Sequence, residues 1–570
     1  MAGLFSALGT GARALLAHQG AVRVAGHNIS NASTEGYSRQ RVNLQASTPE
    51  DLTVGIIGRG VDLKSIDRLT DEFVDRSLRK GSSELKSLDV KQSALKQAEG
   101  VYQELSDNDL STALTKFFTA LDSLADRPED MAVRRTVVDQ AKALSDSFQA
   151  LSKGLNGIRK SLNDDVATTV GKVNSLITDL ADLNKQIVQS EFANASGSRN
   201  ANDLRDARDL KLKQLAELVD ITTAEQSDGQ VNVFVAGDPL VMQNRPNTLT
   251  TSTSTSNGIT VTNPVFANNN GPLILRGGRL EGLVTSRDTT IPKYLTDLNT
   301  LAAGVILEVN KLHAQGIGLT GFSSVTGAKA VTSASAALNA AGLDFTPVNG
   351  SFQVNVTNRN TGSVTTTNIQ VDLDGIAPAD TTLNSLTAAI DAVANISASV
   401  TSDNKLKISA DSTDYTITFT SDTSRALACL GINTLFTGKD STDIGVNSVV
   451  DGDLSKLSAA LTPAAGDNAN AVAMANLRTT AVLNSNTTTL EEFYRGSVGT
   501  LAVESQQKSS AFATQQLRND RLENERQQVS GVNVDEEMIK LMEFQRAYQG
   551  SARFVAVVDE MLDTLVNHLF

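Results

Sequence analysis

Apolar residues recur at every seventh position near both ends of the chain, and this repeat constrains the fold more than any other feature. Near the N-terminus it comprises Leu8, Leu15, Val22 and Ile29, with Leu4 on the same face, and near the C-terminus Val534, Leu541, Tyr548, Val555, Leu562 and Leu569. A sustained seven-residue apolar repeat is typical of helices that pack against other helices in a coiled-coil-like manner. We therefore predict one helix at each end and expect these residues to form an assembly interface.

The C-terminal repeat is wider than two paired helices require. Phe544, Phe554, Val558, Met561 and Leu565 broaden its apolar face. A helix that is apolar over so wide an arc needs neighbours on more than one side. Leaving both terminal stripes in water would forfeit on the order of 20–30 kcal/mol of burial free energy. This favours assembly with other subunits, the alternative being an ordinary helix pair that closes a domain.

The middle of the chain changes from helical to β-rich patterns and back. Apolar residues at three-four spacing near 173–187 indicate a helix, whereas alternation near 352–356 indicates half-buried strands. The low-complexity stretch "TLTTSTSTSNG" is expected to be a solvated hairpin or loop. These patterns predict an α+β multidomain fold with paired terminal helices, a bundle of long helices and inserted β-rich domains.

The predicted division has four parts. They are a terminal helical domain (1–45 with 530–570), a helical bundle (46–220 with 470–529), a β-rich segment with a returning helix at 292–313 (221–324), and an inserted β-rich domain with one helix (325–469).

Composition excludes several classes of protein and site. The net charge is −14, which argues against a nucleic-acid binder, since such proteins carry a basic stripe. Cys429 is the only cysteine, so neither an intramolecular disulfide nor a cysteine zinc site can form. No run reaches the roughly 18 apolar residues of a membrane span. The N-terminal stretch lacks the basic and apolar regions of a signal peptide, so export would need another route.

The stretch "NISNASTEGYSRQ", residues 28–40, has the residue types of an active-site loop and equally those of a helix end. Ser30 and Ser38 have no histidine and carboxylate at suggestive spacing, and the sequence contains neither G-x-S-x-G nor His-Glu-x-x-His. We therefore predict no catalytic, cofactor or metal site. Gly36 can adopt a left-handed turn at no steric cost, which favours the helix-end interpretation.

The same stretch resembles the N-terminal signature of the bacterial flagellar axial proteins, the rod, hook and hook-associated group. The C-terminal stretch "DEEMIKLMEFQRAYQGSARFVAVVDEMLDTLVNHL" resembles their C-terminal helix. "GRGVDLKSIDRLTDEFV" (58–74) and "GDNANAVAMANL" (466–477) narrow the resemblance to the hook-associated members of the hook–filament junction. The resemblance covers most of the chain and is faint at 245–270 and 322–345. Gly550 stands where the family more often has alanine.

The resemblance implies a structural role for the stretch 28–40. Asn31, Gly36, Tyr37 and Arg39 would form a structural turn that leaves the inner layer of the flagellar tube. Tyr37 would pack against helices with its hydroxyl in solvent, and Arg39 would pair with a carboxylate of a neighbour.

The resemblance also implies a non-enzymatic subunit of the hook–filament junction, extracellular and assembled through its terminal helices after type III export. The implied partners are copies of itself in a ring or helical layer, the hook protein, the next hook-associated protein on the filament side, and an export chaperone at the C-terminal region. Neither nucleic acid nor a membrane span is expected. Two alternatives remain open: another axial protein of the hook or distal-rod type, and an adhesin-like binding protein.

Overall fold

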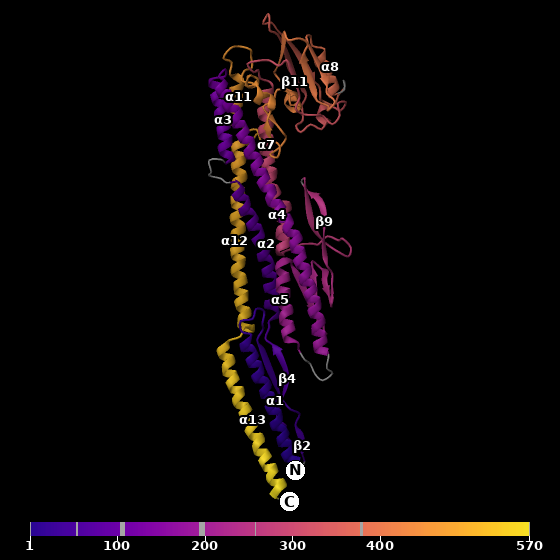
Figure 1. The fold of residues 1–570 in the computed structure, drawn as a ribbon, viewed down its shortest axis with the longest axis vertical. Helices are drawn as coiled ribbons and strands as arrows, with labels where there is room; N and C mark the ends of the chain where they lie inside the picture. The colour runs from indigo at the N-terminus through magenta and orange to yellow at the C-terminus, as the bar shows by residue number, and fades with distance from the viewer. Residues whose placement is uncertain are drawn as a thin grey trace. The chain divides into compact units, whose positions relative to one another are not determined.

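Figure 1 shows the fold in a computed structural model, which describes residues 2–52, 55–102, 109–192, 200–256, 258–376 and 380–568. The chain divides into two compact units. Unit 1 comprises residues 1–93, 161–288 and 507–570, and unit 2 comprises residues 94–160 and 289–506. Three of the four boundaries fall inside long helices, α2 (Glu72–Tyr102), α4 (Met131–Phe192) and α12 (Leu490–Ser530), so each of these contributes residues to both units. The fourth falls inside a π-helical turn, Ser286–Thr290. The four-part division stays a prediction.

The two ends of the chain pair within unit 1. Helix α1 (Ala2–Ser30) lies between α13 (Val534–His568) and a two-stranded ribbon (Figure 1). The ribbon consists of β1 (Gln40–Ala46) and β4 (Val61–Arg68), which pair antiparallel. A short hairpin of β2 (Glu50–Leu52) and β3 (Gly55–Ile57) continues it. The predicted pairing of the N- and C-terminal helices is confirmed.

A β-rich segment follows α5 (Asn202–Leu218) in unit 1. A four-stranded antiparallel sheet consists of β5 (Ile221–Glu225), β6 (Val231–Val235), β7 (Asp238–Met242) and β8 (Arg245–Pro246). Strands β9 (Leu249–Ser256) and β10 (Ile259–Phe266) then form a hairpin. The low-complexity stretch is therefore a hairpin, as the sequence predicts, and the side chains at 250–255 are exposed.

Three asparagines of α4 bind this β-rich segment through its backbone. The Asn174 amide bonds both the N–H and the carbonyl of Leu249, each at 2.8 Å. Asn184 bonds the N–H and the carbonyl of Val231 in the same way, at 3.1 and 2.9 Å. Asn163 accepts the Thr262 N–H at 2.6 Å. The spacing of about three helical turns places all three amides on one face of α4.

The returning helix predicted at 292–313 is α7 (Ile291–Ala314), and the helix predicted inside the inserted β-rich region is α8 (Leu383–Asp391). The other helices are α3 (Leu110–Asp126), α6 (Gly278–Thr285), α9 (Ala426–Leu430), α10 (Ser448–Gly452) and α11 (Ala469–Asn476). The π-helical turn, Ser286–Thr290, joins α6 to α7, which the sequence did not predict.

Unit 2 contains the larger β-rich region. One antiparallel sheet has the order β13 (Val364–Val371), β12 (Gly350–Asn358), β16 (Tyr415–Thr420). A second has the order β11 (Ser324–Thr326), β15 (Leu406–Ala410), β14 (Ile396–Val400), and α8 packs against β14. Two-residue strands, β17 (Phe436–Thr437) and β18 (Gly445–Val446), complete the unit. The inward residues Phe352, Val354, Ile369, Ile417 and Phe419 are at most 3% exposed, so these strands share a dry core.

His313 connects the end of α7 to two loops of unit 2. Its Nδ1 bonds the Asn433 carbonyl at 2.8 Å, and its Nε2 accepts the Ser458 N–H at 3.1 Å. The pKa of His313 is lowered from 6.5 to about 4, chiefly by complete burial and also by Arg134, against the raising effect of the Asn433 carbonyl. The imidazole is therefore neutral in the folded protein at pH 7.

The free energy of unfolding of unit 2 is expected to fall in mild acid because of His313. Below pH 6.5 the imidazole binds a proton in the unfolded chain, whereas in the folded protein it stays neutral down to about pH 4. Between pH 7.5 and pH 5 this linkage removes about 2 kcal/mol. Urea unfolding at the two pH values measures it, with His313→Gln as the control because glutamine does not titrate. An equal loss in both proteins would show that other groups cause the pH dependence.

The predicted α+β class is confirmed: paired terminal helices, long helices and several small antiparallel sheets. In the part of the chain that the structure describes, no helix combines the length and apolar character needed to cross a membrane.

Candidate functional site

Polar side chains from both ends of the chain meet where α1 ends. Asn28 lies in the last turn of α1, Tyr37 and Arg39 lie in the stretch that follows, and Gln40 is the first residue of β1. The fifth residue, Glu537, comes from the first turn of α13. We call these five residues the terminal clasp. Asn28 and Glu537 are 0% and 2% exposed, so two polar groups far apart in sequence are buried together.

The Asn28 amide is the centre of the clasp, with four hydrogen bonds. Its Nδ2 donates to the Gln40 carbonyl at 2.9 Å and to Glu537 Oε2 at 2.8 Å. Its Oδ1 accepts the Gln40 N–H at 3.0 Å and the Tyr37 hydroxyl at 2.7 Å. Because both ends of the amide are used, one side chain joins α1, β1 and α13.

Arg39 binds the start of α13 from the other side. Its Nε donates to Glu537 Oε1 at 2.8 Å and its Nη2 to Glu536 Oε2 at 3.0 Å. Its backbone N–H also donates to the Ser530 carbonyl, the last residue of α12, at 2.8 Å. Burial raises the pKa of Glu537, but the hydrogen bonds from Asn28 and Arg39 outweigh it and hold that pKa below its usual value. The clasp therefore contains a carboxylate that is charged at neutral pH.

Acidic residues of α5 bind the same stretch from outside the helix pair. The Ser38 N–H donates to Asp206 Oδ2 at 3.0 Å, and Gln40 Nε2 donates to Asp203 Oδ1 at 2.9 Å. Arg68 Nη1 contacts both Asp206 and Asp209 at 2.8 Å. Burial raises the pKa of Asp206, against the lowering effect of Arg68. The first residues of β1 and the last of β4 are thus bound to α5.

The predicted structural turn lies between α1 and the clasp. Gly36 has a φ of +82°, as the sequence predicts. Asn31 Nδ2 donates to the His27 carbonyl at 3.0 Å and so covers the end of α1. The Tyr37 hydroxyl, expected in solvent, instead contacts Asn28 and, at 3.1 Å, His27 Nδ1. Burial raises the pKa of this hydroxyl, as does Asp203. Arg39 pairs with carboxylates of its own chain.

Substitution of Gly36 tests whether this stretch acts by shape. Gly36→Val is expected to impair motility strongly, because valine at positive φ costs about 1–3 kcal/mol. The new Cβ would also lie 3.1 Å from Leu210 Cβ. Ser30→Ala and Ser38→Ala each remove one hydroxyl, at about 1 kcal/mol, and should swim almost normally. Swimming halos at matched secretion levels measure the order. If one serine variant cannot swim while Gly36→Val swims normally, the stretch would act as a catalytic site instead.

The residues predicted as an interface on α1 lie beside its buried stripe. Leu4, Leu8, Leu15, Val22 and Ile29 are all half-buried. The buried stripe consists mainly of small residues: Gly11, Ala17, Ala21, Val24 and Ala25, ending at Asn28. A Cβ at Gly11 would lie 2.5 Å from Val555 Cγ2, so α13 approaches α1 closely at this point. The small residues allow the helix contact, and the larger repeat residues flank it.

Helix α13 has apolar residues both toward α1 and away from it. Of its predicted interface residues, Leu541, Val555 and Leu562 are half-buried, Val534 and Tyr548 are each 39% exposed, and Leu569 lies outside the described residues. Seven further residues are 46–62% exposed: Met538, Ile539, Met542, Phe554, Val557, Met561 and Val566. We call five of these, Met538, Ile539, Met542, Val557 and Met561, the outer surface of α13. Phe554 lies against α1, where a Cβ at Gly11 would be 3.1 Å from its Cδ1, and Val566 lies on a different side of the helix. A helix with apolar residues on several sides matches the arc that the sequence predicts.

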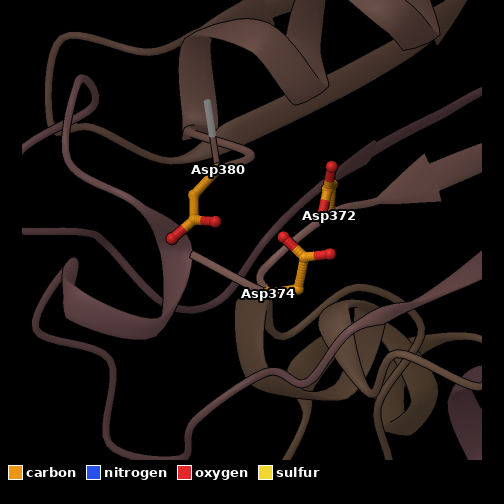
Figure 2. Close-up of side chains that lie close together, drawn as sticks. All are labelled: Asp372, Asp374 and Asp380. Carbon is orange, nitrogen blue, oxygen red and sulfur yellow. The ribbon is translucent and has the colours of Figure 1, made fainter. Parts of the chain in front are cut away.

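Among the residues that the structure describes, one group of carboxylates lies close enough to be considered as a metal site. Figure 2 shows Asp372, Asp374 and Asp380 facing one another between β13 and α8, and their oxygens lie within 4.8 Å of one another. Asp374 accepts the Ile376 N–H and Asp380 accepts the Gly375 N–H, both at 2.9 Å. These contacts explain the acids as turn residues, so we assign no metal to them.

Sequence reasoning did not identify the most buried members of the clasp. In the sequence, Glu537 is one of three consecutive acids that complement the positive start of a predicted helix, and Asn28 is only part of the helix-end stretch 28–40. A signal existed for the α5 acids, because Asp203, Asp206 and Asp209 recur every third residue and so share one helix face. No signal in a single sequence joins Asn28 to Glu537.

Comparisons with known proteins identify relatives along the whole chain. Residues 95–329 match the family described as the flagellar hook-associated protein FlgK helical domain, and residues 524–568 match the flagellar basal body rod FlgEFG protein C-terminal family. The chain is 28% identical to flagellar hook-associated protein 1 of Bacillus subtilis, covering 100% of this chain and 99% of that protein. It is 25% identical to the Escherichia coli protein of the same name, covering 97% and 98%.

A solved structure has a similar fold. It is described as the flagellar hook junction protein FlgK from Burkholderia pseudomallei, with a TM-score of 0.51 and 19% identity, and it covers 80% of this chain and 100% of that chain.

Proposed function

We propose that this chain, which belongs to the flagellar hook-associated protein 1 family, is a structural subunit of the junction between the hook and the filament of the bacterial flagellum. The family is structural and non-enzymatic. Membership implies assembly within the flagellum near the hook. The match to the rod family covers only residues 524–568, so the alternative of a rod-type or hook-type protein has less support.

One observation carries the proposal beyond membership: α13 exposes apolar residues on the side away from α1. The five side chains of its outer surface are about half exposed, although α1 already covers the opposite side. Exposed apolar side chains gathered on one side of a helix are typical of a site for another protein. A subunit whose terminal helices pair with each other, and whose C-terminal helix still exposes apolar residues, is suited to a layered assembly.

The partners follow from this position. Copies of the chain would form the layer, with the hook protein on one side and the next hook-associated protein on the other. The chain would be extracellular after type III export. An export chaperone that held the C-terminal region would cover the outer surface of α13 before assembly, because that surface would otherwise meet water.

Electron microscopy of flagella from a strain that lacks this chain tests the proposal. We expect hooks of normal length without filaments, because the filament would have no junction on which to grow. A plasmid copy of the chain should restore filaments. Complete filaments on hooks of the deletion strain would contradict the proposal, as would loss of the hooks themselves.

A further inference from the structure

The ribbon on the far side of α1 has exposed apolar residues of its own. Ile56 and Ile57 are 74% and 50% exposed, and Leu44 is 40% exposed. Leu63, opposite Leu44, instead packs against α1, where a Cβ at Gly20 would lie 2.5 Å from its Cδ1. The Ser47 N–H donates to the Gly60 carbonyl at 2.9 Å, which joins the hairpin of β2 and β3 to the ribbon. We call Leu44, Ile56 and Ile57 the ribbon surface. Unit 1 therefore has two apolar surfaces at its chain ends, with α1 between the elements that carry them (Figure 1).

We infer that the ribbon surface of one copy packs against the outer surface of α13 of the next copy. This inference rests on the proposed function and names the contact that joins neighbouring subunits. A head-to-tail contact between two different surfaces leaves a free surface at each end and therefore continues until a ring closes or a helical layer forms. A contact of α13 with α13 across a two-fold axis would stop at a dimer.

Charge favours this pairing of surfaces. Residues 2–68 carry seven Lys and Arg against five Asp and Glu, a net +2, whereas α13 carries three against seven, a net −4. Arg41 and Lys64 on the ribbon are exposed and have no ion pair within the described residues. On α13, Glu543, Asp559 and Glu560 are also exposed and also have no ion pair within the described residues. Opposite charges around two apolar surfaces favour their contact, whereas α13 against α13 would bring like charges together.

The dimensions are also compatible. The outer surface of α13 extends from Met538 to Met561, a rise of about 35 Å. Along the ribbon and its hairpin, β1 and β2 together contain about ten residues, which correspond to a length of about 33 Å. One ribbon can therefore cover most of one α13 along its length. Apolar residues on other sides of α13 remain for contacts with other layers.

Disulfide cross-linking in assembled flagella tests the inference. The parent chain carries Cys429→Ser, since that cysteine is only 1% exposed and should be dispensable. Chains with both Ile57→Cys and Val557→Cys should give a ladder of covalent oligomers on oxidation. Cells that express the two single variants together should give dimers only, and either single variant alone should stay monomeric. A second pair, Leu44→Cys with Ile539→Cys, covers the case in which the first variant fails to fold.

The controls separate this inference from the proposed function. Lys172→Cys, exposed on α4, combined with Val557→Cys should give no cross-link. A dimer from Val557→Cys alone would overturn the inference, because it indicates a two-fold contact of α13. The inference would also be overturned if both double-cysteine variants are incorporated into flagella but stay monomeric on oxidation. That result would mean that the ribbon faces another protein. If the parent chain is absent from flagella that carry filaments, the proposed function itself fails.

Discussion

Asn28→Ala should destabilise the pairing of the chain ends by about 3–5 kcal/mol while the rest of the protein stays folded. The substitution removes four hydrogen bonds, one of them to a charged carboxylate. It also leaves the Gln40 N–H without its acceptor and removes a donor from Glu537, in a place where water cannot replace them. A net hydrogen bond contributes about 1 kcal/mol, one to a charged group about 1.5–3 kcal/mol, and unsatisfied buried groups add to the loss.

Limited proteolysis and hydrogen exchange of α1 and α13 measure this loss. The matched control is Asn31→Ala, three residues further along the same stretch. Asn31 is only half-buried and its amide bonds the backbone of its own helix end, so its loss should cost about 1 kcal/mol or less. Similar protection in the two variants would show that the clasp does not hold the ends together.

The turn after α1 could be predicted because its causes are local. Gly36 is the one residue of 31–39 that takes a positive φ without strain, and its φ is +82°. The helix boundaries at both chain ends also follow from local periodicity and from the polar residues around them. These features depend on a few neighbouring residues, which a single sequence displays in full.

The clasp could not be predicted, because its causes are distant in the sequence. Asn28 and Glu537 meet only after both ends have folded and paired, and nothing near either residue specifies the other. The buried stripe of α1 could not be predicted for a related reason. Alanine and glycine carry a weak apolar signal, so the leucine repeat dominates the pattern, although close approach of α13 at Gly11 depends on the absence of a side chain. The predicted repeat residues stay interface candidates, and on α1 they lie beside the contact between α1 and α13.

Ile539→Asp and Val557→Asp are each expected to abolish incorporation into flagella and so to abolish swimming. The two side chains are 62% and 53% exposed, so a carboxylate there is solvated in the isolated chain and the fold tolerates it. In an assembly that covers the outer surface of α13, the same carboxylate would be buried without a partner, at about 3–5 kcal/mol. Burying the remaining area of the five residues is worth on the order of 4–8 kcal/mol per subunit, so one such charge removes a large part of the driving force.

Blots of secreted protein and of purified flagella, together with swimming halos, separate export from incorporation. Gln549→Asp is the matched control, because it adds the same charge at an exposed position of α13 that is already polar. Aspartate has a low helix propensity at 539, 549 and 557 alike, so the control also accounts for any weakening of the helix. If both apolar positions accept aspartate and cells swim normally, the outer surface stays in water after assembly. The paired chain ends would then only close a domain, and the apolar width of α13 would need another explanation.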